Sequence, residues 1–278
     1  RARPVPFTVT IGQPGRDGRL FYDDDFEMNF RTARGKLPDI FRGFDDNEGR
    51  SDAPAIYLTS VDMKLFFDGL VEDNLSPVDD RDPLHSIWIG TATRIAAHND
   101  FPRNLACCAV GRRRFTIFPP EQFENLYVGP LENTPAGRAV SMVDFHAPDF
   151  DAHPRFAEAL RHAQVVELEP GDAVYIPSMW WHHVEGLDPF NVLVNYWWRD
   201  TPAFLGQPQE ALNHAILAIR DLPREERNFW RKLFDHYVFE NPAEVTDHIP
   251  EQARGILSPL TSRTAGQIRA FLLRTLNR

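Results

Sequence analysis

Two histidines and one aspartate in this sequence have the side-chain types that hold a divalent transition metal. His98 and Asp100 are separated by a single residue, and side chains two apart project to the same side of an extended segment. Two imidazoles and one carboxylate on one face of a metal leave three positions open, which suits iron(II) chemistry with oxygen and a co-substrate. The His98-Asn99-Asp100 triplet therefore predicts two of the three ligands of such a site.

The third ligand must come from a distant part of the chain. Two neighbouring histidines, His182 and His183, follow a Pro-Gly-Asp turn and a β-prone run. Adjacent residues on a strand face opposite ways, so only one of the two can point to the same site as His98. Periodicity alone does not choose between them.

The segments that position these residues have the composition of short β-strands. Proline (23 residues) and the aromatic fraction (12%) favour a loop-rich β protein. The first fifty residues indicate strands and turns, followed by a strand and a short helix between Ala55 and Leu70. Later runs predict consecutive strands: SIWIGTAT, NLACCAVG, RRFTIFPP, VVELEPGDAVYIP and NVLVNYWW, with FAEALRHA as a helix.

From Pro208 onward the pattern changes to helical periodicity. The segments EALNHAILAIRDL, ERNFWRKLFDHYVF and AGQIRAFLLRTL each place apolar residues at helical spacing. We therefore expect a mainly β domain over residues 1–205 and a helical C-terminal segment over residues 206–278. The helical segment has either a structural or an association role.

Composition narrows the class of protein. With 278 residues and 42% hydrophobic side chains, the chain can bury a large core. The net charge is −10, and the sequence shows no broad cationic stretch for nucleic acid. It contains neither a run of roughly 18 apolar residues nor an apolar leader, so we expect no membrane partner and a cytoplasmic location. The two cysteines, Cys107 and Cys108, would point to opposite faces of a strand, and we expect no disulfide between them.

An ordered set of motifs resembles a known family. HND followed by Asn104, then VGRRRFTIFPPEQFENLY, EPGDAVYIPSMWWHHVEGL and VNYWW occur in the order and at the intervals of the cupin-like branch of the JmjC oxygenases, the group that contains the asparaginyl hydroxylase of the hypoxia response. The resemblance covers about residues 57–198. It implies a double-stranded β-helix (jelly roll) with added helices, and a C-terminal helical segment that forms a homodimer.

The same resemblance implies roles for individual residues. It makes His182 the third iron ligand, with His98 and Asp100, and it places Arg113 where a basic residue grips the distal carboxylate of 2-oxoglutarate. Alternation allows the neighbouring arginines to face away from Arg113. Further positions implied to contact the co-substrate or the substrate are Tyr57, Asn104 and Asn195 for 2-oxoglutarate, and Trp181 for the substrate.

Two positions depart from the family pattern. Ile95 stands three residues before His98, where a hydroxyl residue commonly helps to bind the co-substrate, and Asn99 replaces the usual aromatic residue. The function that the resemblance implies is that of an Fe(II)- and 2-oxoglutarate-dependent dioxygenase, which uses O2 to hydroxylate an amino-acid side chain of a protein or peptide. The alternative is a non-enzymatic, metal-binding cupin that acts as a binding or scaffold protein.

Overall fold

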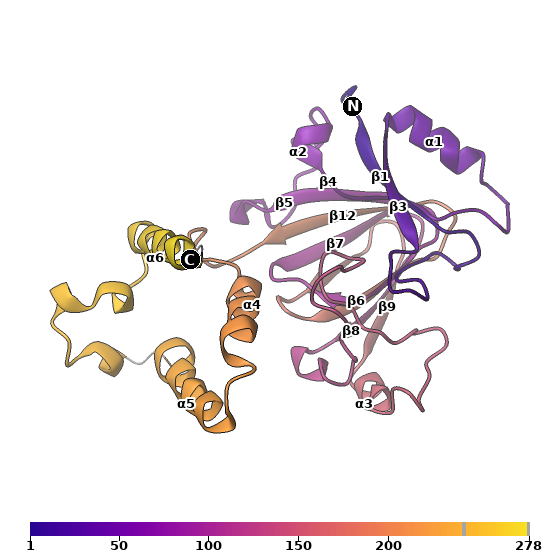
Figure 1. Cartoon of the computed structure of the whole chain (residues 1–278). Coiled ribbons are helices and arrows are strands. Elements are labelled where there is room, and N and C mark those ends of the chain that lie inside the picture. Colours follow the sequence, from indigo (N-terminus) through magenta and orange to yellow (C-terminus); the bar gives the residue numbers. More distant parts are fainter. Residues whose placement is uncertain (241–242, 277–278) are drawn as a thin grey trace. The chain divides into compact units, whose positions relative to one another are not determined.

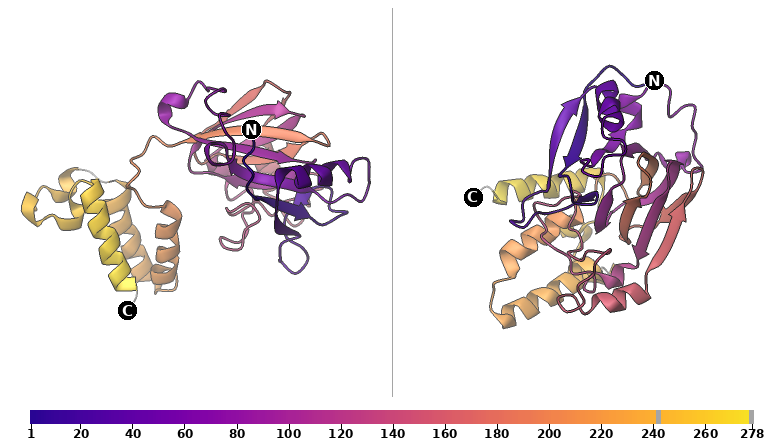
Figure 2. Two further views of the ribbon diagram at one scale, coloured as in Figure 1. Left: turned by 90° about the horizontal axis from the view of Figure 1, so that it is seen from above. Right: turned by 90° about the vertical axis from the view of Figure 1, so that its right-hand side faces the viewer.

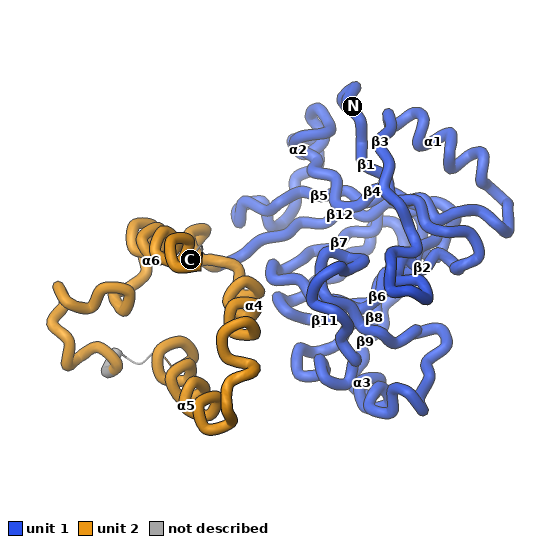
Figure 3. The backbone as a smooth tube through the Cα atoms, viewed as in Figure 1, with its two compact units in different colours: residues 1–200 blue, residues 201–278 orange. Residues whose placement is uncertain are grey.

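The computed structural model describes residues 1–240 and 243–276. The chain divides into two compact units, residues 1–200 and residues 201–278 (Figure 3). The first unit is built mainly of β-strands and the second of helices (Figure 1).

Two sheets make up the first unit. The larger sheet has seven strands in the order β10-β7-β12-β5-β4-β1-β3, and the smaller has five in the order β2-β6-β11-β8-β9. The larger sheet contains β1 (Phe7–Gly12), β3 (Phe30–Gly35), β4 (Ile56–Asp62), β5 (Leu84–Gly90), β7 (Arg103–Val110), β10 (Ala173–Ile176) and β12 (Asn191–Trp198). The smaller sheet contains β2 (Arg19–Leu20), β6 (Arg94–Asn99), β8 (Arg113–Phe118), β9 (Gln164–Leu168) and β11 (Trp181–Gly186).

The two sheets pack against each other through apolar side chains. Ala106 and Leu193 from the larger sheet share a buried cluster with Phe115 and Val184 from the smaller one. Strands that follow one another in sequence, such as β7 and β8, lie in different sheets, which is the arrangement of a jelly roll (Figure 2). The predicted mainly β, double-stranded β-helix fold is therefore confirmed.

Helices cover the outer side of the larger sheet. Ile40 of α1 (Leu37–Asp45) and Met63 of α2 (Met63–Phe66) belong to a buried cluster with Leu58 of β4, and Figure 1 shows both helices on that side of the sheet. The first unit also contains α3 (Phe156–Arg161) and the 3₁₀ turns η1 (Asp79–Arg81) and η2 (Pro120–Gln122). Helix α1 lies within the first fifty residues, where the sequence indicated only strands and turns.

The predicted strands after residue 84 and the predicted helix α3 are present close to their expected positions. A tight turn links β7 to β8, and Gly111 occupies it with φ of +70°. A Cβ atom at this position would lie 2.5 Å from the carbonyl oxygen of Phe190, so only glycine fits the turn. Because Arg113 follows two residues later, this turn fixes where the arginine enters β8. Cys107 and Cys108 on β7 are free thiols.

The second unit contains three α-helices joined by short helical turns: α4 (Pro208–Ile219), α5 (Arg224–Phe234), the π-helical turn η3 (Asp235–Phe239), η4 (Ala243–Thr246), η5 (Glu251–Ala253), η6 (Gly255–Leu257) and α6 (Ser262–Leu276). Among its described residues, Val245 and Ala265 are the buried hydrophobic side chains. Within residues 1–240 and 243–276, no helix has the length and apolar character needed to cross a membrane.

Candidate metal centre and co-substrate cavity

The structure brings His98, Asp100 and His182 together at one end of the smaller sheet. Strands β6 and β11 run antiparallel with His98 directly opposite His182, and Asp100 follows the end of β6. The atoms that these three side chains offer to a metal all lie within 4.8 Å of one another. In the described part of the chain, this is the one group of three or more such side chains with that geometry.

Both histidines are held in the tautomer that a metal requires. The Nδ1 atom of His98 lies 2.9 Å from the carbonyl oxygen of Ala96, and Nδ1 of His182 lies 3.1 Å from that of Trp180. Because a carbonyl oxygen only accepts hydrogen bonds, each Nδ1 must carry the proton. The lone pair is therefore on Nε2 of each ring, and in His182 this atom lies 3.6 Å from Oδ2 of Asp100.

The electrostatics keep His98 and Asp100 in their metal-binding protonation states. Burial, together with the neighbouring His182, lowers the pKa of His98 to about 4, so its ring is neutral at pH 7. Burial alone would raise the pKa of Asp100. The neighbouring His182, His98 and Arg138 outweigh this effect and hold the pKa of Asp100 at about 2. The site thus offers a neutral His98 imidazole and an ionised Asp100 carboxylate.

A strained turn leads into β11 and fixes His182 relative to Asp100. Met179 has φ of +68°, and its backbone N–H donates to the carbonyl oxygen of Asp100 at 2.8 Å. The hydroxyl of Ser178 donates to the carbonyl oxygen of Phe101 at 2.6 Å. A non-glycine residue in the left-handed region costs free energy and is concentrated at functional sites. The turn therefore joins the two segments that carry the ligands.

His183 points to the other face of β11. It is buried, its ring lies 4.6 Å from the ring of Phe145, and its two ring nitrogens have no hydrogen-bond partner among the described residues. Burial, followed by the nearby positive groups His146 and Arg94, lowers the pKa of His183 to about 3. The choice left open by the alternation is therefore resolved geometrically, because His182 faces Asp100 and His183 does not.

We expect His182→Ala and His183→Ala to have different effects. His182→Ala should weaken Mn(II) binding by at least about 100-fold, because it removes a metal ligand. His183→Ala should leave Mn(II) affinity within about threefold and lower the free energy of unfolding by about 2–4 kcal/mol, because it leaves a cavity beside Phe145. Electron paramagnetic resonance of free Mn(II) and urea unfolding measure the two quantities. Equal losses of affinity in both variants would contradict the assignment.

Arg113 lies inside the barrel, with none of its surface exposed. Its three guanidinium nitrogens are buried and have no hydrogen-bond partner within residues 1–240 and 243–276. The guanidinium carbon lies 6.0 Å from the centre of the Tyr57 ring, which is a weak contact at the limit of a cation–π interaction. The neighbouring arginines face outward as the alternation allowed: Arg112 pairs with Asp188 and Arg114 with Glu167.

A buried, unpaired guanidinium is costly, and an anionic ligand would remove the cost. Arginine can hold a carboxylate through two parallel hydrogen bonds. The donor set around Arg113 therefore fits the far carboxylate of 2-oxoglutarate, and the His98, Asp100 and His182 set fits iron(II).

Tyr57, Asn104 and Asn195 line the same cavity as the three proposed ligands. The two asparagines, on β7 and β12, are both buried, and Nδ2 of Asn195 donates to Oδ1 of Asn104 at 2.6 Å. Tyr57 of β4 lies opposite Gly90 of β5, where any Cβ atom would come within 2.4 Å of the tyrosine ring. These three predicted co-substrate positions are thus brought together, although they come from three different strands. The fourth, Arg113, does not line the cavity, but its guanidinium carbon lies 6.0 Å from the centre of the Tyr57 ring.

The cavity has a volume of about 460 Å³, within the usual range for small-molecule sites of about 300–1,000 Å³. Trp88 and Trp197, which were not among the predicted site residues, also line the cavity.

Trp181 is not among the residues that line the cavity. It is 5% exposed and packs with Phe118 and Leu126 in a separate buried cluster. The structure therefore gives Trp181 a packing position and not the expected position beside a substrate.

Ile95 and His98 both line the cavity although they are three residues apart. Strict alternation would place them on opposite faces. The pairing of β6 with β11 shifts register between His182 and Val184, since His182 lies opposite His98 while Val184 lies opposite Ile95. Such an irregularity inserts one extra residue in β6 and turns both side chains inward.

A loop before residue 141 closes one side of the cavity. Pro135, Ala136 and Gly137 line the cavity, and Arg138 anchors them. Its Nε donates to the carbonyl oxygen of Asn99 at 3.2 Å, and its guanidinium lies over the Phe101 ring at 3.8 Å. No sequence pattern indicated this role of Arg138, because it depends on a contact between distant segments.

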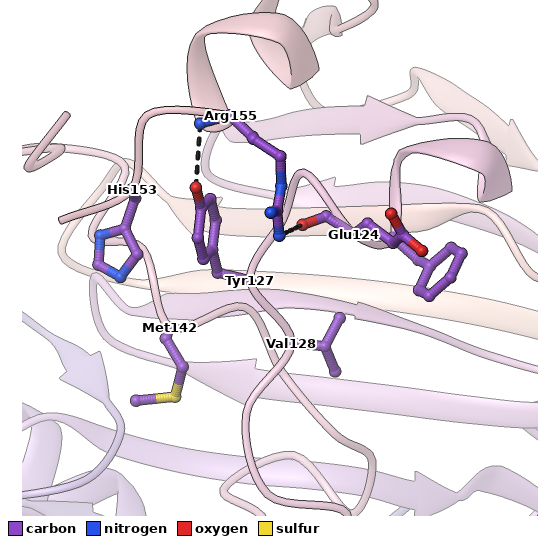
Figure 4. A pocket seen from close by; sticks show the side chains of 7 residues that line it. Glu124, Tyr127, Val128, Met142, His153 and Arg155 are labelled. Carbon is purple, nitrogen blue, oxygen red and sulfur yellow. Dashed lines mark hydrogen bonds between the residues drawn. The ribbon is translucent and has the colours of Figure 1, made fainter. Parts of the chain in front are cut away.

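A second hollow of about 430 Å³ lies beside Tyr127 (Figure 4). Its arginine is already engaged, since the backbone N–H of Arg155 donates to the Tyr127 hydroxyl at 3.0 Å and its Nη2 donates to the carbonyl oxygen of Glu124 at 2.9 Å. The Tyr127 ring also lies 4.8 Å from that of His153. These contacts hold the loop together, and the proposed metal ligands are not among the residues lining the hollow.

The family model described as the cupin-like domain matches residues 1–204. The chain belongs to the cupin-like domain family. It is 33% identical over 166 residues to human HSPB1-associated protein 1, covering 58% of this chain and 32% of that protein. It is 34% identical over 115 residues to the Arabidopsis thaliana lysine-specific demethylase JMJ31, covering 41% of this chain and 20% of the relative.

A third similar protein is the chicken (Gallus gallus) tRNA wybutosine-synthesizing protein 5, with 28% identity over 150 residues, covering 49% of this chain and 44% of that protein. The matched regions thus span less than half the length of each of these three relatives. The predicted membership of the cupin-like branch of the JmjC oxygenases is confirmed. The names of the relatives point to more than one class of substrate.

Proposed function

We propose that this protein is an Fe(II)- and 2-oxoglutarate-dependent oxygenase that hydroxylates an amino-acid side chain in a protein or peptide. The observation that carries the proposal is the buried Arg113, whose guanidinium has no hydrogen-bond partner among the described residues, in the same barrel as His98, Asp100 and His182. In a cupin that bound only a metal, a buried guanidinium without an anionic partner would lower stability and serve no function. A dicarboxylic keto acid bound between the metal and Arg113 would use both features.

Each group of residues has a defined task in this proposal. His98, Asp100 and His182 hold the iron, which with 2-oxoglutarate and O2 supplies the oxidising chemistry and releases succinate and carbon dioxide. Arg113 pairs with the distal carboxylate, and Tyr57, Asn104 and Asn195 offer hydrogen bonds to the co-substrate. The chain itself orients these groups and, through the loop that Arg138 anchors, keeps water away from the site.

The substrate class rests on charge. A chain of net charge −10 repels a polyanion, so we propose a protein or peptide substrate in preference to RNA, although one relative is named for a tRNA modification. Apart from the three proposed metal ligands, the side chains that line the cavity are uncharged. This favours one neutral side chain, presented at the cavity mouth, as the hydroxylated group.

The test is calorimetry of 2-oxoglutarate binding under anaerobic conditions, with Mn(II) in place of Fe(II). We expect binding that requires the metal, and we expect Fe(II)-loaded protein in air to convert 2-oxoglutarate to succinate in step with hydroxylation of a peptide substrate. Absence of 2-oxoglutarate binding to metal-loaded protein would favour the alternative, a non-enzymatic cupin that serves as a binding or scaffold protein.

We also propose that the second unit pairs with a second copy of this chain. A groove between α4, α5 and α6 has a volume of about 930 Å³ and is lined by Ala215, Trp230, Leu272 and other apolar residues. Several large apolar side chains of the unit are exposed, including Leu217 (79%) and Leu273 (64%). Exposed apolar area of this extent marks an association surface.

Light scattering during gel filtration tests the pairing. We expect wild-type protein to have twice the mass of the chain, and Leu273→Glu to shift it to the single-chain mass because a carboxylate cannot be buried in an apolar interface. Val165→Glu, which changes a residue of β9 that is 61% exposed in the first unit, is the matched control and should leave the mass unchanged. A wild-type protein of single-chain mass would contradict the proposal.

A further inference from the structure

Trp88 lines the cavity and carries a hydrogen-bond donor that no described residue uses. Its indole Nε1 is buried and has no hydrogen-bond partner among the described residues, although the side chain lines the same cavity as His98 and His182. A buried N–H without an acceptor lowers stability, and such groups in folded proteins call for an explanation. A ligand with an acceptor atom at this place would provide one.

The surroundings of Trp88 indicate which part of a ligand it would meet. Its ring centre lies 5.8 Å from that of Tyr57. The guanidinium carbon of Arg113 lies 6.0 Å from the same Tyr57 ring centre. Trp88 and Ile95 pack against the same two buried clusters. The indole therefore lies beside Tyr57 and Ile95, and Arg113 approaches the same tyrosine ring.

The chemistry of Ile95 leaves a role for this donor. A hydroxyl residue at that position would offer a hydrogen bond to the co-substrate, whereas isoleucine offers none. We propose that the indole N–H of Trp88 donates to the distal carboxylate of the keto acid held by Arg113, and so replaces the missing hydroxyl from the opposite sheet. This inference rests on the proposed function. It makes Trp88 a specificity residue that favours dicarboxylic over monocarboxylic keto acids.

The experiment is calorimetric binding of 2-oxoglutarate to Mn(II)-loaded variants. Trp88→Phe keeps an aromatic ring and removes the N–H, and we expect it to weaken binding by about tenfold or more, the usual loss for a hydrogen bond to a charged group. Ile95→Thr in the Trp88→Phe background should restore a large part of the affinity. In the wild-type background it should change affinity by less than about threefold, because the indole already serves the carboxylate.

Trp197→Phe is the matched control. It removes the same N–H and the same ring volume from the same cavity, and its Nε1 is also unpartnered among the described residues. The Trp197 ring contacts that of Trp88 edge to face, with ring centres 6.0 Å apart. Unlike Trp88 and Ile95, however, Trp197 is not among the described side chains that pack against the buried cluster containing Tyr57. We expect this control to change 2-oxoglutarate affinity by less than about threefold.

The outcomes separate this inference from the proposed function. Loss of binding in Arg113→Ala with full binding in Trp88→Phe would overturn the role of Trp88 alone, whereas a metal-loaded wild-type protein that binds no 2-oxoglutarate would overturn both. If Trp88→Phe does not fold, nuclear magnetic resonance of Zn(II)-loaded wild-type protein decides. The indole N–H signal of Trp88 should move downfield on addition of 2-oxoglutarate, and an unmoved signal would overturn the inference.

Discussion

Asp100→Asn is expected to abolish metal-dependent conversion of 2-oxoglutarate to succinate and to weaken Mn(II) binding by more than about 100-fold. Asp100 supplies the carboxylate among the three proposed ligands, whereas the pKa of His98 is lowered to about 4, so that its ring is neutral at pH 7. Loss of a group that merely supports a ligand costs about 10- to 100-fold, so loss of a ligand should cost more. Asparagine keeps the shape of the side chain, which restricts the change to charge and coordination.

Asn99→Ala is the control for this prediction. Asn99 is adjacent to Asp100 and lies opposite Trp181, on the side of the strand pair that faces away from the cavity. Its side-chain oxygen is 3.5 Å from Arg138, so the variant loosens a loop contact without removing a ligand. We expect Mn(II) affinity within about threefold of wild type. Succinate formation by Asp100→Asn at the wild-type rate would show that the proposed metal centre is not the site of the reaction.

The fold and the closeness of His98 and Asp100 could be predicted because both depend on local order along the chain. His98 and Asp100 share a face through their spacing, and Arg113 is separated from its neighbours by alternation, with Arg112 and Arg114 pointing outward to acidic partners. Without the family resemblance, the sequence did not show which of His182 and His183 faces the inside of the barrel. Alternation puts the two side chains on opposite faces, but which face is inside is decided only when the strand is placed in a sheet.

Other features depend on contacts between distant segments, which periodicity does not encode. Trp88 lies on a strand that was predicted, but its direction toward Tyr57 follows from the pairing of β4 with β5. The register shift that turns Ile95 inward arises from the pairing of β6 with β11. Helix α1 was missed because the first fifty residues mix β-prone runs with Gly, Pro and Asp, which indicated strands and turns. Its apolar residues Ile40, Phe41 and Phe44 are held by packing against the larger sheet. Tertiary packing overrode local propensity there.

Arg113→Met is expected to produce two effects of opposite sign. Without 2-oxoglutarate, the variant should unfold at a higher urea concentration than wild type, by about 1–4 kcal/mol in free energy, because methionine fills similar space without burying a charge. With Mn(II) and 2-oxoglutarate, wild type should gain stability from the ligand while the variant gains almost none, because the distal carboxylate has lost its partner. A residue that served only the fold would not give this crossover.

Arg113→Lys separates charge from geometry. Lysine keeps the positive charge but forms a point contact instead of two parallel hydrogen bonds, so we expect it to bind 2-oxoglutarate about tenfold more weakly than wild type and to gain no stability in the absence of ligand. If Arg113→Met instead unfolds far more easily than wild type, the guanidinium is paired in the folded protein. If it still binds 2-oxoglutarate normally, another group holds the carboxylate. The sign of the stability change therefore tells whether the Arg113 guanidinium stays unpaired in the folded protein until a ligand binds.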